Sequence, residues 1–243
     1  MKTVIITRPV PAMAAAEEVY AQAGLKVFQA PVFDIQTNTS VEPAWLRQPA
    51  DLWVVLSVNA LNHALKIDAE MKPAADSRVI AVGPAVAKAW KTHFGQDIEY
   101  HPLMNSEGVV ELLKVYQPQN IQILTTGAGR ELIRTHCMNH SISFRQINSY
   151  VRVPLPLDLM AIGQLYLESD AVTLTATSSD ILTAFVKQLP NDLTDQVLSS
   201  PVVVGAARIA DLADELGFTK VFLASSPSDQ DMAQAVTNHS NKI

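Results

Sequence analysis

The sequence predicts an α/β fold of two similar domains, each with a parallel sheet covered by helices on both faces. Several short runs of apolar, mostly β-branched residues lack alternation with polar residues, as expected for strands buried on both faces. Most of these runs precede a helical pattern, and two long segments of the chain resemble each other at a nearly constant offset. These observations indicate two similar doubly wound parallel-sheet domains of the flavodoxin/Rossmann-like kind.

The strand candidates occur along the whole chain, at residues 4–6, 52–56, 79–82, 121–124, 172–175, 202–204 and 221–223. Two helix candidates have clear ends. Met13–Ala23 is followed by Gly24, and glycine readily adopts the left-handed conformation that ends many helices. Ala85–Phe94 follows Pro84, and proline suits the first turn of a helix. This candidate ends before a second glycine. The chain therefore reads as strand–helix units in series.

The internal repeat concerns the second and fourth quarters of the chain. VIAVGPAVAKAWKTHFG (79–95) aligns without a gap on PVVVGAARIADLADELG (201–217), which places Gly83 on Gly205. Upstream, LSVNAL matches TSSDIL at nearly the same offset, and a weaker match joins the first segment to residues 130–146. The order A, B, A′, B′ indicates duplicated domains. The repeats alone leave open whether A folds with B or with B′.

Composition excludes several classes of protein. The 243 residues are 48% hydrophobic and 17% charged with a net charge of −6, which argues against a nucleic-acid-binding protein. No apolar run is long enough to span a membrane, and the N-terminus reads as a core strand rather than a signal peptide. Cys137 is the single cysteine, so a disulfide framework and a thiolate zinc site are excluded. We expect a soluble, cytoplasmic protein.

Familiar cofactor motifs do not occur in this sequence. It contains no GxxxxGK[ST] and no GxGxxG after a strand, which argues against ATP and NAD. DxD and HExxH clusters do not occur either. His136 and His140 are four residues apart, but no carboxylate or thiolate accompanies them on that helix face, so an exposed helix turn is the favoured interpretation. We expect no cofactor and no metal.

Small hydroxylic residues or glycines recur where a strand ends and a helix begins. Carboxyl ends of parallel strands face the ligand in open α/β sheets, and the N–H groups of helix N-termini hold anions. The alternative for each serine or threonine is simple helix capping. Seven such places together favour a ligand with many anionic groups: Thr7, Ser57, Gly83, Thr126–Gly127, Thr177–Ser178, Gly205 and Ser228.

Few basic residues accompany these turns. Arg8, Arg130 and Arg208 lie at or just past strand ends, where a guanidinium group can pair with a carboxylate. Arg8 is fixed between a threonine and a proline, whereas Arg130 could equally be a helix-surface residue. The segment TTGAGRE (125–131) could cradle an anion through its backbone, although a tight turn needs glycines anyway.

Two extended segments separate the repeated units, VFDIQTNT (32–39) and NSYVRVPLPLD (148–158). Pro154 and Pro156 exclude a helix in the second one. We interpret both as linkers and expect a ligand cleft between two domains. Tyr150 lies in the second linker, where its phenol can donate a hydrogen bond or a proton. The alternative is an aromatic side chain that packs the hinge.

Taken together, these motifs resemble those of a known family, the uroporphyrinogen-III synthases, which cyclise hydroxymethylbilane in haem and tetrapyrrole biosynthesis. The resemblance covers essentially the whole chain. Each motif is short, and the order and spacing of the motifs make the resemblance specific. They are TRP (7–9), LSVNA (56–60), AVGPAVA (81–87), TTGAGRELI (125–133), SYVRVP (149–154), TATSSDIL (175–182) and VVVGAARIADLADELGF (202–218).

The resemblance implies two α/β domains joined by a two-stranded linker, in which the N-terminal segment belongs to the domain completed by the C-terminal half. Segment A would then fold with B′ and segment B with A′. The implied boundaries are a discontinuous domain of residues 1–34 and 154–243, a second domain of residues 38–147, and linker strands near 32–38 and 148–154.

The resemblance also implies the chemistry. The substrate would be a linear tetrapyrrole with eight carboxylates, held in the inter-domain cleft largely by backbone N–H groups and hydroxyls. Ring closure with loss of water and inversion of ring D would need no metal or cofactor. Tyr150 matches the family's catalytic tyrosine and would help the hydroxyl group leave. The implied substrate-binding residues are Thr7, Arg8, Ser57, Asn59, Gly83, Gly127, Arg130, Thr177, Ser178, Ala206 and Ala207.

One turn departs from the family pattern. Many relatives carry a serine or threonine where this chain has Ala206, Ala207 and Arg208. A hydroxyl contact is therefore not expected there, and only the backbone N–H groups of the two alanines would serve the substrate.

Two other functions remain open from the sequence. The first is a non-catalytic two-domain binder of a small polyanionic ligand, against which the missing signal peptide argues in its periplasmic form. The second is a sugar-nucleotide transferase, which would need a DxD motif or a basic diphosphate clamp. We expect a monomer that contacts a small molecule, no nucleic acid and no membrane.

Overall fold

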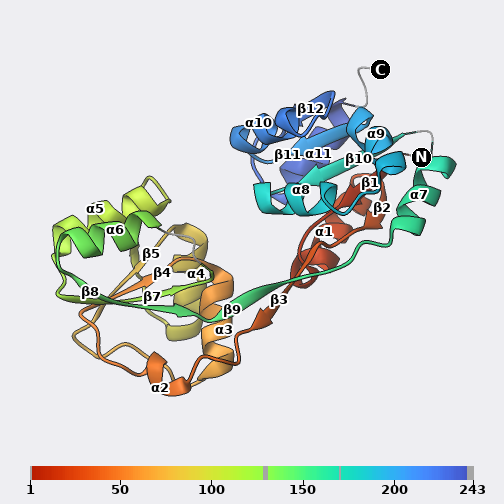
Figure 1. The fold of residues 1–243 in the computed structure, drawn as a ribbon. Helices are drawn as coiled ribbons and strands as arrows, with labels where there is room; N and C mark the ends of the chain where they lie inside the picture. The colour runs from red at the N-terminus through yellow and green to blue at the C-terminus, as the bar shows by residue number, and fades with distance from the viewer. Residues whose placement is uncertain (1, 128–130, 170, 240–243) are drawn as a thin grey trace. The chain divides into compact units, whose positions relative to one another are not determined.

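In the described part of the chain, two parallel five-stranded sheets carry helices on their faces, and a separate two-stranded sheet links them (Figure 1). The structure is a computed structural model that describes residues 2–127, 131–169 and 171–239. It confirms the predicted α/β class and the two parallel sheets. By its internal contacts the chain divides into unit 1, Met1–Ile35 with Arg152–Ile243, and unit 2, Gln36–Val151.

Unit 1 contains a sheet whose strands follow the order β12-β11-β10-β1-β2, with each neighbouring pair parallel. Because all its strands point the same way, their carboxyl ends meet at one edge. Ile6 pairs with Thr175 in the register between β1 and β10. The strands are β1 (Thr3–Ile6), β2 (Lys26–Gln29), β10 (Val172–Ala176), β11 (Pro201–Val204) and β12 (Lys220–Leu223).

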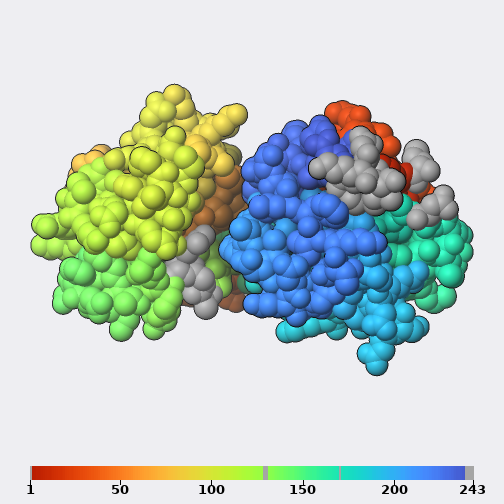
Figure 2. Space-filling view, turned by 90° about the horizontal axis from the view of Figure 1, so that it is seen from above, coloured from red at the N-terminus to blue at the C-terminus, as the bar shows by residue number. Residues whose placement is uncertain are grey.

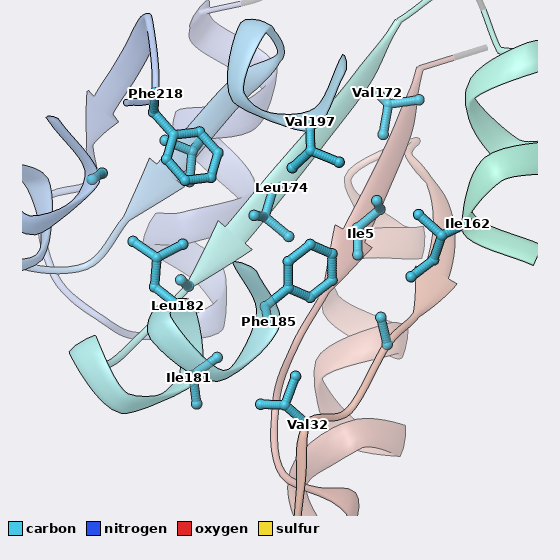
Figure 3. Close-up of a cluster of buried hydrophobic side chains, with 14 of the residues drawn as sticks. Ile5, Val32, Ile162, Val172, Leu174, Ile181, Leu182, Phe185, Val197 and Phe218 are labelled. Carbon is cyan, nitrogen blue, oxygen red and sulfur yellow. The ribbon is translucent and has the colours of Figure 1, made fainter. Parts of the chain in front are cut away.

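Helices cover both faces of this sheet. Ile5 and Leu174 point to one face, where α7, α8, α9 and α10 bury side chains such as Phe185 (Figure 3). Val4 and Ile6 point to the other face, against α1 and α11, because successive residues of a strand face opposite sides. The helices are α1 (Val10–Gln22), α7 (Leu159–Glu168), α8 (Ser179–Val186), α9 (Asn191–Ser199), α10 (Ala207–Glu215) and α11 (Asp229–His239).

Unit 2 contains the second sheet, in the order β6-β5-β4-β7-β8 and again parallel throughout. Leu52 and Val54 face α5 and α6, whereas the intervening Trp53 is buried on the opposite face. The elements are β4 (Leu52–Val55), β5 (Arg78–Ala81), β6 (Glu99–Tyr100), β7 (Asn120–Thr125), β8 (Ser143–Asn148), α2 (Pro43–Leu46), α3 (Val58–Ile67), α4 (Pro84–Phe94), α5 (Ser106–Tyr116) and α6 (Glu131–Asn139).

The two units share one topology if unit 2 is read from a different starting strand. Numbered along the chain, the strands of unit 1 lie in the order 2-1-3-4-5. Unit 2 has the same order when counting starts at β7, as β8-β7-β4-β5-β6. The aligned repeats therefore correspond to equivalent elements, and the topology supports the duplication that the sequence indicates.

Two further strands, β3 (Phe33–Thr37) and β9 (Tyr150–Pro154), pair with each other where the chain passes between the units. A backbone hydrogen bond from Asn38 N to Ser149 O extends the pairing at one end. Figure 2 shows the surface of each unit in the colours of the chain, orange to green for unit 2 and mainly cyan to blue for unit 1. Among the described helices, none is long and apolar enough to cross a membrane.

Local signals place the ends of the two predicted helices within three residues of those observed. α4 spans Pro84–Phe94, and its C-cap Gly95 has a left-handed φ of 69°. α1 begins at Val10, three residues before the predicted start, because the proline at position 11 fits its first turn. The sequence does not predict β2, β6 and β8. These edge strands are partly exposed and polar, or only two residues long in the case of β6.

Candidate functional site

The carboxyl edge of each sheet collects the residues that the sequence marks. In an open parallel sheet the ligand site lies where the strand order reverses, because the connections leave the edge in opposite directions there. In unit 1 this switch point lies between β1 and β10, and in unit 2 between β7 and β4. Thr7 and Thr177 follow the first pair of strands, and Ser57 and Gly127 follow the second.

Thr7 and Arg8, the polar residues of the turn after β1, both make hydrogen bonds to other elements of unit 1. The Thr7 hydroxyl is buried and donates to the carbonyl oxygen of Thr175 at 2.6 Å. Arg8 Nη1 donates to Thr177 Oγ1 at 3.1 Å, and Nη2 donates to Asp229 Oδ2 at 3.3 Å. Arg8 Nε and Asp229 Oδ1 lie 3.2 Å apart, within ion-pair range although not aligned for a hydrogen bond.

The Arg8 guanidinium group thus connects the turns after β1, β10 and β12. The Arg8 and Asp229 side chains are 27% and 17% exposed, so the ion pair is partly shielded from water. Because arginine only donates, Thr177 Oγ1 accepts this bond, and its own O–H remains available as a donor to a ligand. Asp229 was not predicted as a partner of Arg8, which the sequence had suggested would face a substrate carboxylate.

Tyr20 lies beneath this network. Burial raises the pKa of Tyr20 to about 12, while a hydrogen bond with the Thr175 side chain opposes the shift and the nearby Asp229 adds to it. The phenol therefore stays neutral at physiological pH. Thr175 in turn donates from Oγ1 to the carbonyl oxygen of Ile5 at 3.1 Å, so the hydroxyl groups under the turn are internally paired.

The start of α8 lies beside the Arg8 network. Ser178 caps the helix, accepting from the Ile181 backbone N–H at 3.3 Å. Ser178 is therefore an N-cap, as in the alternative of simple helix capping. Arg208 Nη1 donates to Ser179 Oγ at 3.1 Å, a contact that the sequence analysis did not foresee.

Ala206 and Ala207 lie on the neighbouring turn, after β11. Ala206 is the N-cap of α10 and makes no side-chain capping bond. Backbone N–H groups of a first helical turn lack intrahelical partners, so this turn offers donors without a hydroxyl. Gly205 fits closely here, because a Cβ atom in its place would lie 2.7 Å from Pro227 Cα.

The equivalent edge of unit 2 is built from different groups. Ser57 caps α3 by accepting from the Ala60 backbone N–H at 3.0 Å, and Asn59 is exposed in the first turn of that helix. Gly83 is the buried N-cap of α4. Gly127 has a left-handed φ of 58° and accepts from Gln146 Nε2 through its carbonyl oxygen. Arg130 lies outside the described residues.

Tyr150 begins β9 and is 4% exposed. Its carbonyl oxygen accepts a hydrogen bond from Thr126 Oγ1 at 2.7 Å, which ties the strand to the end of β7. Its ring lies 5.6 Å from the ring of His63, centroid to centroid. His63 Nδ1 in turn lies 2.9 Å from Thr37 Oγ1. The contact with His63 could not be predicted from the sequence, since 87 residues separate it from Tyr150.

Apolar side chains also reach the carboxyl edge of unit 2. Tyr100, Leu103, Met104 and Leu132 are exposed. Met104 lies against the turn after β5, where a Cβ atom on Gly83 would be 3.5 Å from its own Cβ. This edge therefore combines helix caps with exposed apolar groups.

Comparisons with known proteins agree with this geometry. The family described as uroporphyrinogen-III synthase HemD matches residues 14–234. No curated protein matches the chain. Among solved structures, a triple mutant of the uroporphyrinogen III synthase from the extremely thermophilic bacterium Thermus thermophilus has 16% identity and a TM-score of 0.70 over 100% of both chains.

Two further structures give the same result. The wild-type protein from Thermus thermophilus, in another crystal form, has 16% identity and a TM-score of 0.54 over 100% of this chain and 99% of its own. The uroporphyrinogen-III synthetase from Helicobacter pylori has 15% identity and a TM-score of 0.62 over 98% of this chain and 100% of its own. These likenesses show the fold. The family match spans most of the sequence, and the chain belongs to the uroporphyrinogen-III synthase family.

Proposed function

We propose that this chain cyclises hydroxymethylbilane to uroporphyrinogen III, with loss of one water molecule and inversion of ring D. The observation that carries the proposal is the family match over residues 14–234. The two switch points with their helix starts support it, because they offer donors suited to a substrate with many carboxylates. Family membership does not favour the non-catalytic binder.

At the edge of unit 1 we place carboxylates of the substrate near Thr7, Arg8, Thr177 and Ser178. The Thr177 hydroxyl is the best-prepared donor, because Arg8 already fills an acceptor position on its oxygen. Ala206 and Ala207 would contribute backbone N–H groups at the start of α10. A helix N-terminus stabilises a nearby anion by about 0.3–1 kcal/mol, so several turns must share the charge.

At the edge of unit 2 the proposed contacts are Ser57, Asn59, Gly83, Gly127 and Arg130. The backbone N–H groups at the starts of α3 and α4 are the donors here. The exposed apolar residues beside them suit the pyrrole rings of the substrate, since apolar surface is stabilised when water leaves it.

Tyr150 is the proposed general acid. Protonation of the leaving hydroxyl group would release water and leave an azafulvene-like cation, which the substituted carbon of ring D attacks. A spiro intermediate then fragments and closes with ring D inverted. The contacts of Tyr150 with His63 and Thr126 support a fixed phenol, and a positioned acid typically contributes about 10²–10⁴ in rate. Holding the two chain ends in place is the second requirement.

The direct test supplies hydroxymethylbilane to the purified chain and separates the oxidised products by isomer. We expect the type III isomer to dominate. A matched reaction without protein gives the spontaneous type I isomer as the reference. Type I alone in the presence of the folded protein would refute the proposed function.

Three finer points belong to the same proposal. We infer a monomer that binds no nucleic acid and works in the cytoplasm, in keeping with the net charge of −6. Light scattering after size exclusion and a filter-binding assay with duplex DNA test the first two. We also propose folding domains of residues 1–34 with 154–243 and of residues 38–147. Limited proteolysis should then cut first near 35–38 and 148–153.

A further inference from the structure

A hollow in unit 2 lies at the C-terminal ends of α5 and α6, beside the amino ends of β7 and β8. Its volume is about 700 Å³. It lies at the sheet edge opposite to the switch point, so the proposed function does not use it. Its lining residues come from the two helices and the loops that follow them, and the three ionisable ones are Lys114, His136 and His140.

His136 is the central group of this hollow. It is 8% exposed, which corrects the expectation of an exposed helix turn at this position. Its ring stacks on that of His140, with centroids 4.2 Å apart and an angle of 29° between the planes. Within the described residues, no hydrogen bond satisfies a ring nitrogen of His136. A largely buried imidazole whose ring nitrogens make no hydrogen bond to the described residues thus lines the hollow, where a ligand or water can reach it.

The tautomer of His140 follows from its hydrogen bond. Its Nδ1 lies 2.9 Å from the carbonyl oxygen of His136. Because a carbonyl oxygen only accepts, Nδ1 carries the hydrogen, and in the neutral ring Nε2 keeps its lone pair. Metal-binding histidines almost always donate their second ring N–H in this way, to a carbonyl or a carboxylate.

The adjacent Cys137 takes no part in this hollow. It is fully buried in the core of unit 2 and is not among the residues that line the hollow.

The spacing of the two histidines suits one shared ion, because residues four apart lie on the same face of a helical turn. Zinc–nitrogen bonds of about 2.0–2.1 Å at a tetrahedral angle place the two nitrogens roughly 3.4 Å apart. The rings are now stacked with centroids 4.2 Å apart, so the side chains must rotate out of the stack for one nitrogen of each ring to face the ion. The negative ends of two helix dipoles also point at this hollow, which favours a cation over an anion.

We propose that His136 and His140 bind a divalent transition-metal ion of the zinc or nickel class. Among the described residues, no three histidine, cysteine or carboxylate side chains already surround a metal position. Water completes the coordination, or Glu111 does after leaving Lys114, which it now contacts at 2.7 Å. Nickel binds such imidazole sites readily, in keeping with the general order of affinities for divalent ions.

The test is calorimetric titration of zinc chloride and nickel chloride into the full chain, freed of metal by a chelator and carrying no histidine tag. We expect about one equivalent to bind at pH 7.5 and the affinity to fall at pH 5.5, because protons compete for the imidazoles. His140→Ala should weaken binding at least tenfold. His140 is exposed, so this variant keeps the core intact.

His93→Ala is the matched control, since His93 is also an exposed helical histidine of unit 2, and its affinity should equal that of the native chain. His136→Gln keeps a polar side chain at the buried position and should also lose binding, with native folding checked by circular dichroism. Absence of binding in the native chain would overturn the proposal. Equal affinities of the native chain and His140→Ala would do so too.

Discussion

The two carboxyl edges differ in chemistry although the two sheets share one topology. In unit 1 the turns are tied together by charged side chains, with Arg8 bound to Asp229 and to Thr177. In unit 2 the corresponding turns are tied to the backbone. There Thr126 donates to the carbonyl oxygen of Tyr150, and Ser149 donates to that of Ala60 at 2.7 Å.

This difference shows which properties the duplicated units have kept. The strand order and the helix starts at the switch point are common to both units. The side chains that close the turns are not. Under the proposed function, the polar edge of unit 1 suits carboxylates, while the apolar edge of unit 2 suits pyrrole rings and holds the phenol of Tyr150.

The largest effect is expected at Tyr150, which has no equivalent in unit 1. Tyr150→Phe removes the hydroxyl group but keeps the ring that packs on His63. We expect the rate of type III formation to fall by about 10²-fold or more if the phenol is the general acid. The free energy of unfolding should change by less than about 0.5 kcal/mol. Steady-state kinetics and urea unfolding measure the two quantities.

Tyr116→Phe is the control for this variant, because Tyr116 ends α5 in the same unit, away from the carboxyl edge of the sheet. Its turnover should equal that of the native chain. If Tyr150→Phe also turns over at the native rate, the phenol is hinge packing and the edge of unit 2 has no acid.

A pair of equivalent glycines tests how tightly each edge is built. Gly205 and Gly83 occupy the same place in the repeat. Gly205→Ala would put a Cβ atom 2.7 Å from the backbone of Pro227, whereas on Gly83 it would only touch Met104 at 3.5 Å. We expect Gly205→Ala to lower the free energy of unfolding by about 1–3 kcal/mol, and Gly83→Ala by less than about 0.5 kcal/mol.

The unfolding measurement must distinguish unit 1 from unit 2. All three tryptophans, Trp45, Trp53 and Trp90, lie in unit 2, so tryptophan fluorescence reports that unit, and far-UV circular dichroism reports both. Equal losses for the two glycine variants would mean that the close approach at Pro227 relaxes without cost.

Variants of the Arg8–Asp229 ion pair distinguish an effect on substrate binding from an effect on the stability of the fold. Arg8→Ala removes both the charge and the bond to Thr177, so KM should rise about tenfold and stability should fall by roughly 1–2 kcal/mol. Asp229→Asn leaves the guanidinium group in place and should change KM much less. If both variants raise KM equally, Arg8 acts only through the turn that it shares with Asp229.

Local sequence signals predicted the parts of the fold that depend on neighbouring residues. Proline and glycine marked the ends of α4, and unbroken apolar runs marked the central strands. The repeat indicated two similar domains because equivalent turns keep equivalent residues. The edge strands β2 and β8 were missed, since their partly exposed faces carry polar residues and weaken the apolar signal.

The contacts inside the candidate site could not be predicted in the same way. Asp229 reaches Arg8 across 221 residues, and His63 meets Tyr150 only through the fold. The sequence showed where strands end, which places donors at an edge. It did not show that Arg8 already has a carboxylate partner, because that depends on how α11 packs beside β1. The burial of His136 was hidden for the same reason, since α5 covers it from elsewhere in the chain.

The smallest effects are expected at the two capping serines, one in each unit. Ser57 and Ser178 make the same bond to the N–H three residues ahead. If capping is their whole role, Ser57→Ala and Ser178→Ala each lower the free energy of unfolding by about 1 kcal/mol, and KM stays unchanged. Under the proposed function, Ser178→Ala should raise KM more than Ser57→Ala does, because Ser178 lies on the polar edge between two arginine-bound hydroxyls. Equal KM values for the two variants would show that the edges treat the substrate alike, despite their different chemistry.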